Sequence, residues 1–288
     1  MITRLDHTVL ICPDIDAGIH SYTVLLGREP DWVSEDAKAG TATVLFRMEN
    51  TALELMAPAG EGAVGARLRH ILQESGPRLT SLAFASDDLD TDHRMMTRRA
   101  LAPGEIGSHA SEDKTGKGLR YWKSYRCPDD ACAGVKTFIL QHSAMQKMEE
   151  VAATLNKSHV HALDHLVINT PNPERAVAHY GSRLGLDFRL DRTAEQWKTR
   201  FMFFRLGGLT LEVIHRLDME HDSDADDTIW GLTWAVADLN AAHERLRAIG
   251  LTVSDIRKGR KPGSTVFTVK DGTLGIPTLF IAHETETA

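Results

Sequence analysis

The stretch LDHTVLICPDI at residues 5–15 recurs as LDHLVINTPNP at residues 163–173, an offset of 158 positions. The same offset holds without a gap across about fifty residues, which indicates an internal duplication. The other matched pairs are Tyr22 with Tyr180, Leu26 with Leu184, Gly27 with Gly185, Phe46-Arg47 with Phe204-Arg205, and Leu53-Glu54 with Leu211-Glu212. A chance match of one short motif would not keep a single register over this length.

The pattern inside each copy predicts a strand, then a helix, then further strands. Leu5, His7 and Val9 fall on one side of a strand with its two-residue period. A helix is predicted from Pro13 to Leu26, and Gly27 suits the left-handed residue that commonly ends a helix. The strands predicted after this helix span residues 43–46 and 52–56.

Two weaker units follow the strong ones, because LTSLAFASDDL at residues 79–89 resembles IWGLTWAVADL at residues 229–239. Each leads into a predicted helix and ends in a predicted strand. The helices are expected at residues 91–100 and 240–249, and the strands at 137–142 and 278–283. The four units span roughly residues 5–56, 79–142, 163–214 and 230–283.

The predicted fold class is therefore α+β, with four strand-helix-strand units grouped into two domains. We expect an N-terminal domain at residues 1–142, a helical linker at 143–160 and a C-terminal domain at 161–288. The linker is expected to be an amphipathic helix because its apolar residues recur at helical spacing. These residues are Met145, Met148, Val151, Ala152 and Leu155.

A histidine and a glutamate recur 47 residues apart in both strong copies, as His7 with Glu54 and as His165 with Glu212. A lone histidine on an apolar strand face is more often a core residue than a ligand. Each glutamate, however, interrupts an apolar strand, where a carboxylate needs a charged partner, a metal or a proton. Imidazole with carboxylate suits Fe, Zn, Ni or Mn better than Ca or Mg.

These residues resemble the vicinal-oxygen-chelate superfamily, which includes glyoxalase I, methylmalonyl-CoA epimerase, extradiol dioxygenases and bleomycin-resistance proteins. The resemblance rests on Leu-Asp-His in the first strand, Tyr22 and Leu26-Gly27 around the helix, and Leu-Glu-Leu in the fourth strand. It implies βαβββ units that pair into cups, with a divalent metal on the concave face. It also implies that His7, Glu54, His165 and Glu212 are the metal ligands, and that Glu54 and Glu212 are able to shuttle a proton.

The weaker units depart from the family's ligand pattern. Alignment places Ser81 and Phe138 at the second unit's ligand positions, and Gly231 and Leu279 at the fourth unit's. If units pair one with two and three with four, each cup has two matching ligands, and metal binding is weak. The additional ligands that the sequence offers are His142 and His283, which end the last strands, then His109, His215 and His243, or a residue from a homodimer partner.

Arg47 and Arg205 occupy equivalent third-strand positions, where each can hold a substrate carboxylate or simply face outward. His142 and His283 are also candidates for substrate contact. Segment 104–118 is flexible in composition and is expected to be a lid or a loop. The acidic stretch 218–227 is expected to be an exposed connector, and the basic run 257–261 a solvated loop.

The composition limits the function classes. A formal charge of -7 argues against general binding of nucleic acid or anionic membranes. No apolar run approaches the ~20 residues of a membrane span, and we expect a cytoplasmic protein with reduced cysteines. The preferred function is a metal-dependent lyase, isomerase or dioxygenase that acts on a small oxygenated molecule. The alternative is a non-catalytic binding protein of the bleomycin-resistance type.

Overall fold

The computed structural model describes residues 1–143 and 156–284. Residues 144–155 of the predicted helical linker lie outside the described residues, whereas residues 156–159 form a turn and Val160 begins a strand, so the end of the linker is not helical. No helix among the described residues is long and apolar enough to cross a membrane.

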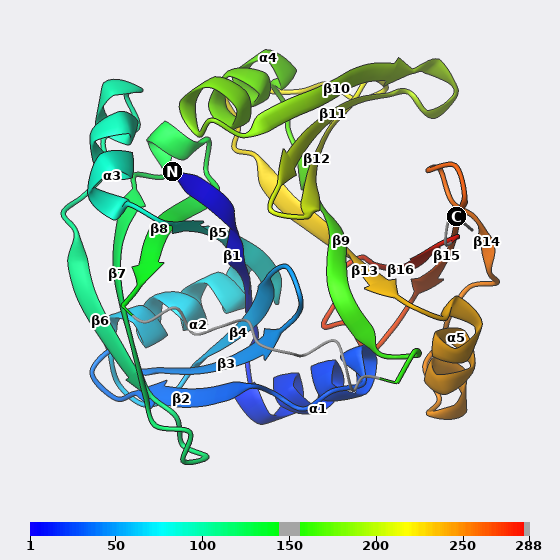
Figure 1. The fold of residues 1–288 in the computed structure, drawn as a ribbon, viewed down its shortest axis with the longest axis horizontal. Helices are drawn as coiled ribbons and strands as arrows, with labels where there is room; N and C mark the ends of the chain where they lie inside the picture. The colour runs from blue at the N-terminus through cyan, green and yellow to red at the C-terminus, as the bar shows by residue number, and fades with distance from the viewer. Residues whose placement is uncertain (144–155, 285–288) are drawn as a thin grey trace.

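The strands form two sheets of eight, drawn in Figure 1. The first sheet contains β1 (Ile2–Ile11), β2 (Trp32–Asp36), β3 (Thr41–Arg47), β4 (Ala52–Pro58), β5 (Arg78–Ser86), β6 (Gly107–Glu112), β7 (Leu119–Cys127) and β8 (Lys136–His142). The second contains β9 (Val160–Asn169), β10 (Asp187–Ala194), β11 (Thr199–Leu206), β12 (Leu209–Arg216), β13 (Thr228–Val236), β14 (Arg257–Lys258), β15 (Ser264–Val269) and β16 (Thr278–His283). Their orders are β2-β3-β4-β1-β5-β8-β7-β6 and β10-β11-β12-β9-β13-β16-β15-β14.

The helices connect these strands. They are α1 (Ile15–Leu26), α2 (Ala63–Ser75), α3 (Leu89–Arg98), α4 (Pro173–Ala176), which continues as the π-helix η2 (Val177–Arg183), and α5 (Leu239–Ala248), with short 3-10 turns at Asp130–Cys132 and Glu195–Trp197. Asp14 caps the start of α1, and Gly27 ends it with a φ of 75°, as predicted.

The sheet order shows how the units pair. β1 pairs antiparallel with β5, and β9 pairs antiparallel with β13, so units one and two share a sheet and units three and four share the other. Within a unit the first strand lies parallel to the last, as β1 does to β4. The predicted α+β fold with two cup-shaped halves is confirmed, whereas the domain boundaries at 142 and 161 stay a prediction.

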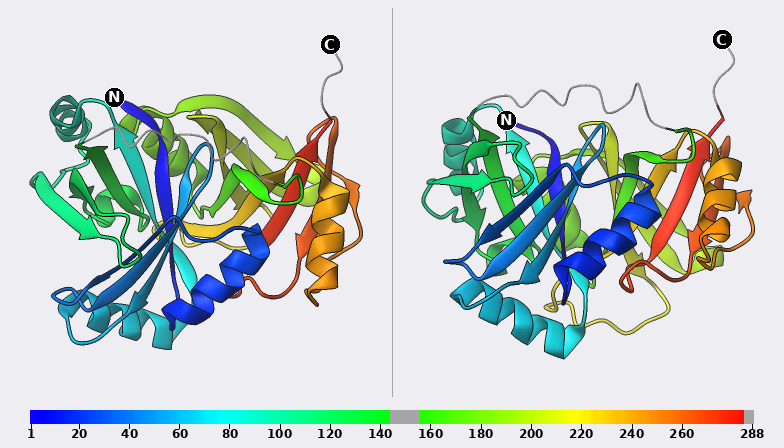
Figure 2. Two further views of the ribbon diagram at one scale, coloured as in Figure 1. Left: turned by 60° about the horizontal axis from the view of Figure 1, so that its bottom comes forward. Right: turned by 90° about the horizontal axis from the view of Figure 1, so that it is seen from below.

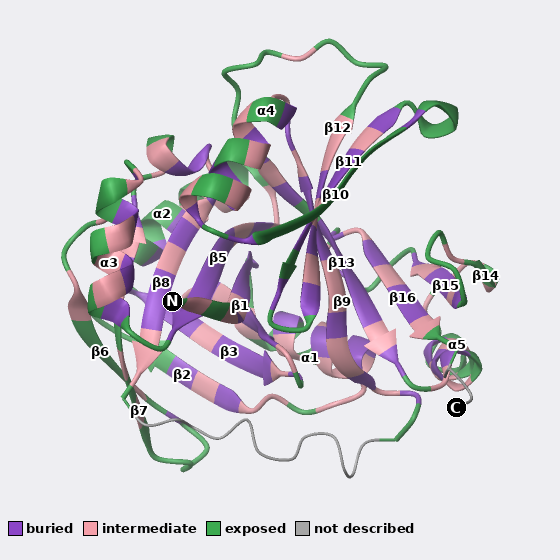
Figure 3. Cartoon of the chain, turned by 45° about the horizontal axis from the view of Figure 1, so that its top comes forward, coloured by how far each residue is buried: buried purple, intermediate pink, exposed green. Residues whose placement is uncertain are grey.

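A single continuous core joins the two halves, because one cluster of buried apolar residues contains side chains from both sheets. Tyr22 and Tyr180 are fully buried in it, as predicted. Tyr22 donates a hydrogen bond to the carbonyl of Thr273, and Arg245 donates one to the carbonyl of Leu25. Figure 3 shows the buried residues concentrated on the central strands, while β10 at the edge is largely exposed.

Helix α2 has no place in the predicted pattern, and it closes one end of the first sheet. Leu68 on its inner face packs against Val9 and Ile11 of β1, and both views in Figure 2 show α2 lying below that sheet. Gly65 permits this approach, because a Cβ there would lie 2.1 Å from the carbonyl oxygen of Gly40. The first cup therefore has an apolar floor. The second copy has no such helix, because the equivalent residues 217–227 form a loop.

Two expectations about loops are wrong. Residues 107–112 of the expected lid form the edge strand β6, because they pair with β7. In the acidic stretch, Asp227 is buried: it accepts hydrogen bonds from Thr170 and Tyr180 and pairs with Arg175 at 3.0 Å. The rest of that stretch, Asp218–Asp226, is mostly exposed as expected.

Candidate functional site

A β-bulge on β1 directs two successive side chains into the first cup. The pairing with β5 skips Asp6 between Leu5 and His7, so the strict alternation of the sequence pattern breaks there. His7 consequently shares the concave face with Val9, and Leu5 lies on the opposite side, in the main core. The prediction that Leu5 and His7 share a face is therefore wrong, and Asp6 joins the site.

Asp6 fixes the orientation of the His7 ring. The Asp6 carboxylate accepts a hydrogen bond from His7 Nδ1 at 2.8 Å, and an ionised carboxylate only accepts, so the proton is on Nδ1. His7 Nε2 then faces Glu54 Oε2 at 3.8 Å. Glu54 is buried on β4, beside Val9 of β1. The structure thus brings the predicted His7 and Glu54 together in one concavity.

The second cup repeats this arrangement. A register shift on β9 again places Asp164 beside His165, whose Nδ1 lies 2.6 Å from the Asp164 carboxylate. His165 Nε2 lies 3.5 Å from Glu212 Oε2. The duplicated sequence has therefore kept the full Asp-His-Glu geometry in both halves.

The two cups differ at the residue opposite the histidine. Ala83 pairs with His7 in the first sheet, whereas Thr233 pairs with His165 in the second. The Thr233 hydroxyl lies 2.8 Å from His165 Nε2 and forms a hydrogen bond with this ring nitrogen, which faces the cup. Alanine offers no such group, and His7 Nε2 stays open toward Glu54.

The histidines that end the last strands reach the aspartates. His142 Nε2 lies 3.0 Å from Asp6, and His283 Nε2 lies 2.6 Å from Asp164. Both were predicted to contact substrate or to serve as extra metal ligands. The structure places each of them against the aspartate that also contacts His7 or His165. In the second cup Lys261, from the basic run predicted to be a solvated loop, also pairs with Asp164 at 2.7 Å.

Burial and hydrogen bonding shift the pKa values of Asp6 and His7 in opposite directions. Burial raises the pKa of Asp6, but hydrogen bonds from His142 and His7 outweigh it and hold that pKa far below its usual range. Burial lowers the pKa of His7, but the hydrogen bond to Asp6 and the nearby Glu54 charge outweigh it and raise that pKa. Asp6 is therefore ionised at neutral pH and stabilises positive charge at His7.

Strand register locates the remaining family ligand positions. Ser81 pairs with Val9 and Phe138 pairs with Ala83, which makes them the counterparts of His7 and Glu54 in unit two. Gly231 and Leu279 hold the same places in the second sheet. Among residues 1–143 and 156–284, no three His, Cys, Asp or Glu side chains are arranged to hold one ion. Of the four family ligand positions in each cup, two thus carry a histidine or a glutamate.

The other predicted residues lie at different places. Arg47 borders a small hollow beside Asp6 and His142, while Arg205 is exposed on β11. His109 lines the first cup and stacks on Trp122. His215 and His243 bond to the backbone carbonyls of Thr170 and Ser254, and neither belongs to a group of three metal-binding side chains among the described residues.

A cavity of about 660 Å³ fills the first cup and contains residues that the sequence reasoning missed. Arg120 on β7 enters it, with its guanidinium 5.0 Å from the ring centre of Trp122 and 5.3 Å from that of Trp32. The buried Nε of Arg120 has no hydrogen-bond partner. The signal was present in the sequence, because Arg120, Trp122, Ser124 and Arg126 recur at every second position and all line the cavity.

Comparison with protein families supports this architecture. Residues 5–161, more than half of the chain, match the family described as glyoxalase-like domain, and residues 164–267 match the glyoxalase/bleomycin resistance protein/dioxygenase superfamily. The chain belongs to the glyoxalase superfamily. The two glyoxalase-like regions lie in tandem, as the sequence repeat predicts.

This glyoxalase-like chain is similar in sequence, over a short stretch, to an epimerase. An ethylmalonyl-CoA/methylmalonyl-CoA epimerase from Cereibacter sphaeroides is 33% identical over 63 residues, which is 22% of this chain and 47% of that protein. The glyoxalase-like chain therefore matches about half the length of that relative.

Two solved structures share the fold over nearly the whole chain. A triple mutant of 4-hydroxymandelate synthase from Streptomyces coelicolor has a TM-score of 0.70 at 14% identity, covering 100% of this chain and 94% of its own. The Mn(II)-bound glyoxalase from Novosphingobium aromaticivorans has a TM-score of 0.61 at 15% identity, and the match covers 98% of this chain and 82% of the glyoxalase. At these identities the likeness establishes the fold alone.

Proposed function

We propose that this chain is a divalent-metal-dependent enzyme whose first cup acts on a small oxygenated organic molecule. One observation carries the proposal: His7 Nε2 is open toward Glu54 Oε2 at 3.8 Å while Asp6 holds His7 Nδ1. Metal-binding histidines characteristically donate their second ring nitrogen to a carboxylate in this way.

The donor set fits a metal such as Fe, Zn, Ni or Mn. First-shell donors lie about 2 Å from their ion, so two donors of one ion are separated by at most about 4 Å, and the 3.8 Å between His7 and Glu54 meets that limit. Two protein donors leave the other coordination positions to water and substrate. When bound there, the metal supplies Lewis-acid polarisation of a substrate oxygen.

The surrounding residues define what the protein contributes. Glu54 Oε2 is placed to take a proton from a substrate carbon and return it. Arg120, unpartnered at Nε, is placed to hold an anionic oxygen beside it. The apolar wall of Val9, Met56 and Phe138 excludes water from this chemistry. A lyase or isomerase reaction is favoured over ring cleavage, because Gly231 and Leu279 stand at the fourth unit's ligand positions.

The relatives support the same reading. The epimerase match supports proton transfer at a carbon, and the Mn(II) of the structurally similar glyoxalase supports a divalent metal in this type of cup. The competing proposal is a metal-free binding protein, which the apolar cavity wall favours.

Metal analysis separates the two functions. Protein purified without chelating resin and titrated in turn with Mn(II), Fe(II), Ni(II) and Zn(II) is expected to bind about one equivalent of at least one metal, as measured at equilibrium by titration calorimetry. Absence of binding of all four metals at neutral pH would favour the binding protein.

A reciprocal substitution tests which cup is active. Ala83→Thr is expected to place a hydroxyl on His7 Nε2 and weaken Mn(II) binding about tenfold, the value of one hydrogen bond. Thr233→Ala is expected to free His165 Nε2 and add a second Mn(II) site. Mn(II) titration followed by electron paramagnetic resonance measures both. Equal Mn(II) binding by the wild type and Ala83→Thr contradicts the assignment to the first cup.

A further inference from the structure

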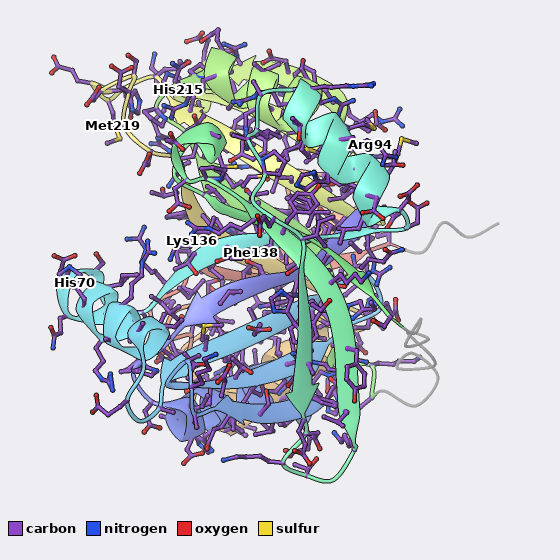
Figure 4. The ribbon with its side chains drawn as sticks, turned by 90° about the vertical axis from the view of Figure 1, so that its left-hand side faces the viewer. His70, Arg94, Lys136, Phe138, His215 and Met219 are labelled. Atoms are coloured by element: carbon purple, nitrogen blue, oxygen red, sulfur yellow. The ribbon has the colours of Figure 1, made fainter. Side chains whose placement is uncertain are left out.

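The first cup carries a group of positive side chains away from His7 and Glu54. Arg67 on α2, Arg126 on β7 and Lys136 on β8 all line the cavity, although they come from three separate elements. Lys136 and Phe138 lie two positions apart on β8, and Figure 4 labels both of them together with His70 of α2. We call Arg67, Arg126 and Lys136 the cationic group.

The charge of this group is only partly balanced. Asp129 pairs with Arg126 and lies 3.9 Å from Arg67, so three cations meet one carboxylate and two positive charges remain. Lys136 is half-buried, and its pKa is lowered, first by burial and then by the charge of Arg67. Arg67 is exposed and Arg126 partly exposed, but placing their charges beside the half-buried Lys136 is unfavourable unless an anion accompanies them. The whole chain is negative, with a formal charge of -7, so this local excess is not a general surface property.

The spacing between the two ends of the cup follows from strand register. Glu54, Val9, Ser81 and Lys136 form one row across four neighbouring strands. Three strand spacings separate Glu54 from Lys136, or about 14 Å along the sheet. The cavity wall between them is apolar, with Val9 and Phe138 facing inward.

We propose that the cationic group of Arg67, Arg126 and Lys136 is a binding site for a terminal phosphate of the substrate. This proposal rests on the proposed function, because it assigns the reacting oxygens to the His7 and Glu54 end. Two net positive charges match a phosphate monoester, which carries about -1.5 to -2 at pH 7, and arginine matches its oxygens in a bidentate manner. The substrate class is therefore an elongated molecule with an oxygenated end, an apolar middle and a phosphate.

Binding of matched probes tests the proposal. The probes are 3-phenylpropyl phosphate, 4-phenylbutanoate and neutral 3-phenylpropanol, titrated into the full chain and measured by isothermal titration calorimetry. The phosphate is expected to bind at least tenfold tighter than the alcohol, with the carboxylate between them. The double substitution Arg126→Met and Lys136→Met is expected to remove this preference and leave alcohol binding within twofold.

A control on the same strand separates this local effect from net charge. Lys123 is exposed on β7 and does not line the cavity, so Lys123→Met is expected to leave all three affinities unchanged. Equal binding of phosphate and alcohol by the wild type, or an unchanged phosphate preference in the double variant, overturns the proposal. Mn(II) titration of the double variant reports on the proposed function separately: unchanged Mn(II) binding with a lost phosphate preference supports both proposals, and absent Mn(II) binding in the wild type refutes only the enzyme assignment.

Discussion

Alanine in place of His7 is expected to abolish Mn(II) binding by the first cup, because Glu54 alone cannot hold the ion against water. His165→Ala is the matched control, since Thr233 already occupies the corresponding nitrogen at 2.8 Å. That control is expected to leave Mn(II) binding within twofold of the wild type. Electron paramagnetic resonance of free Mn(II) measures both affinities.

Asparagine at position 6 is expected to weaken Mn(II) binding by the first cup without abolishing it. Asp6→Asn keeps a hydrogen bond to His7 but removes the buried negative charge that stabilises the ring as a donor. Substitutions of such supporting carboxylates weaken metal binding about 10- to 100-fold. Asp164→Asn in the second cup is expected to have no effect on the same titration. If Asp164→Asn and His165→Ala lower Mn(II) affinity more than Asp6→Asn and His7→Ala, the second cup is the active one.

The sequence predicted the histidine-glutamate pairs because a duplication repeats every constraint. Glu54 and Glu212 interrupt apolar strands at the same offset from a histidine, and two occurrences indicate a shared cause. The structure places both pairs within 3.8 Å. Their role as metal ligands stays a prediction.

The sequence could not predict the role of Asp6, because a two-residue period assigns it to the opposite face from His7. The bulge that reverses this assignment depends on how β1 pairs with β5, and that pairing is a tertiary property. The contrast between Ala83 and Thr233 was hidden for the same reason, since only the strand register sets each of them opposite its histidine.

Helix α2 was missed because it has no counterpart in the repeat. Gly65 within the helix weakens a helix prediction, since glycine lowers helix propensity by about 1 kcal/mol relative to alanine, and Gly62 precedes the helix as its N-cap residue. The structure explains both glycines by contact with the backbone around Gly40. The cationic group depends on this helix for Arg67, so it was equally beyond the sequence pattern.

Alanine at Gly65 is expected to destabilise the protein and open the floor of the first cup. The added Cβ would lie 2.1 Å from the carbonyl oxygen of Gly40, and a backbone oxygen cannot rotate away. Overpacking of this kind costs about 1–3 kcal/mol or more, which exceeds the ~1 kcal/mol that alanine gains over glycine in a helix. The midpoint of urea unfolding is therefore expected to fall, and binding of 3-phenylpropyl phosphate to weaken as α2 shifts with Arg67.

Gly18 in α1 provides the matched control, because it is also a buried glycine in a helix. A Cβ at Gly18 would lie 3.1 Å from Cys12 Sγ and 3.2 Å from Leu55 Cδ1, both of which are side-chain atoms that can move by a few tenths of an ångström. Gly18→Ala is therefore expected to change the free energy of unfolding by less than about 1 kcal/mol, since the gain in helix propensity offsets the crowding. The comparison isolates backbone contact as the reason for glycine at position 65. If Gly65→Ala proves as stable as Gly18→Ala and binds the phosphate probe normally, α2 does not form the floor of the cup in solution.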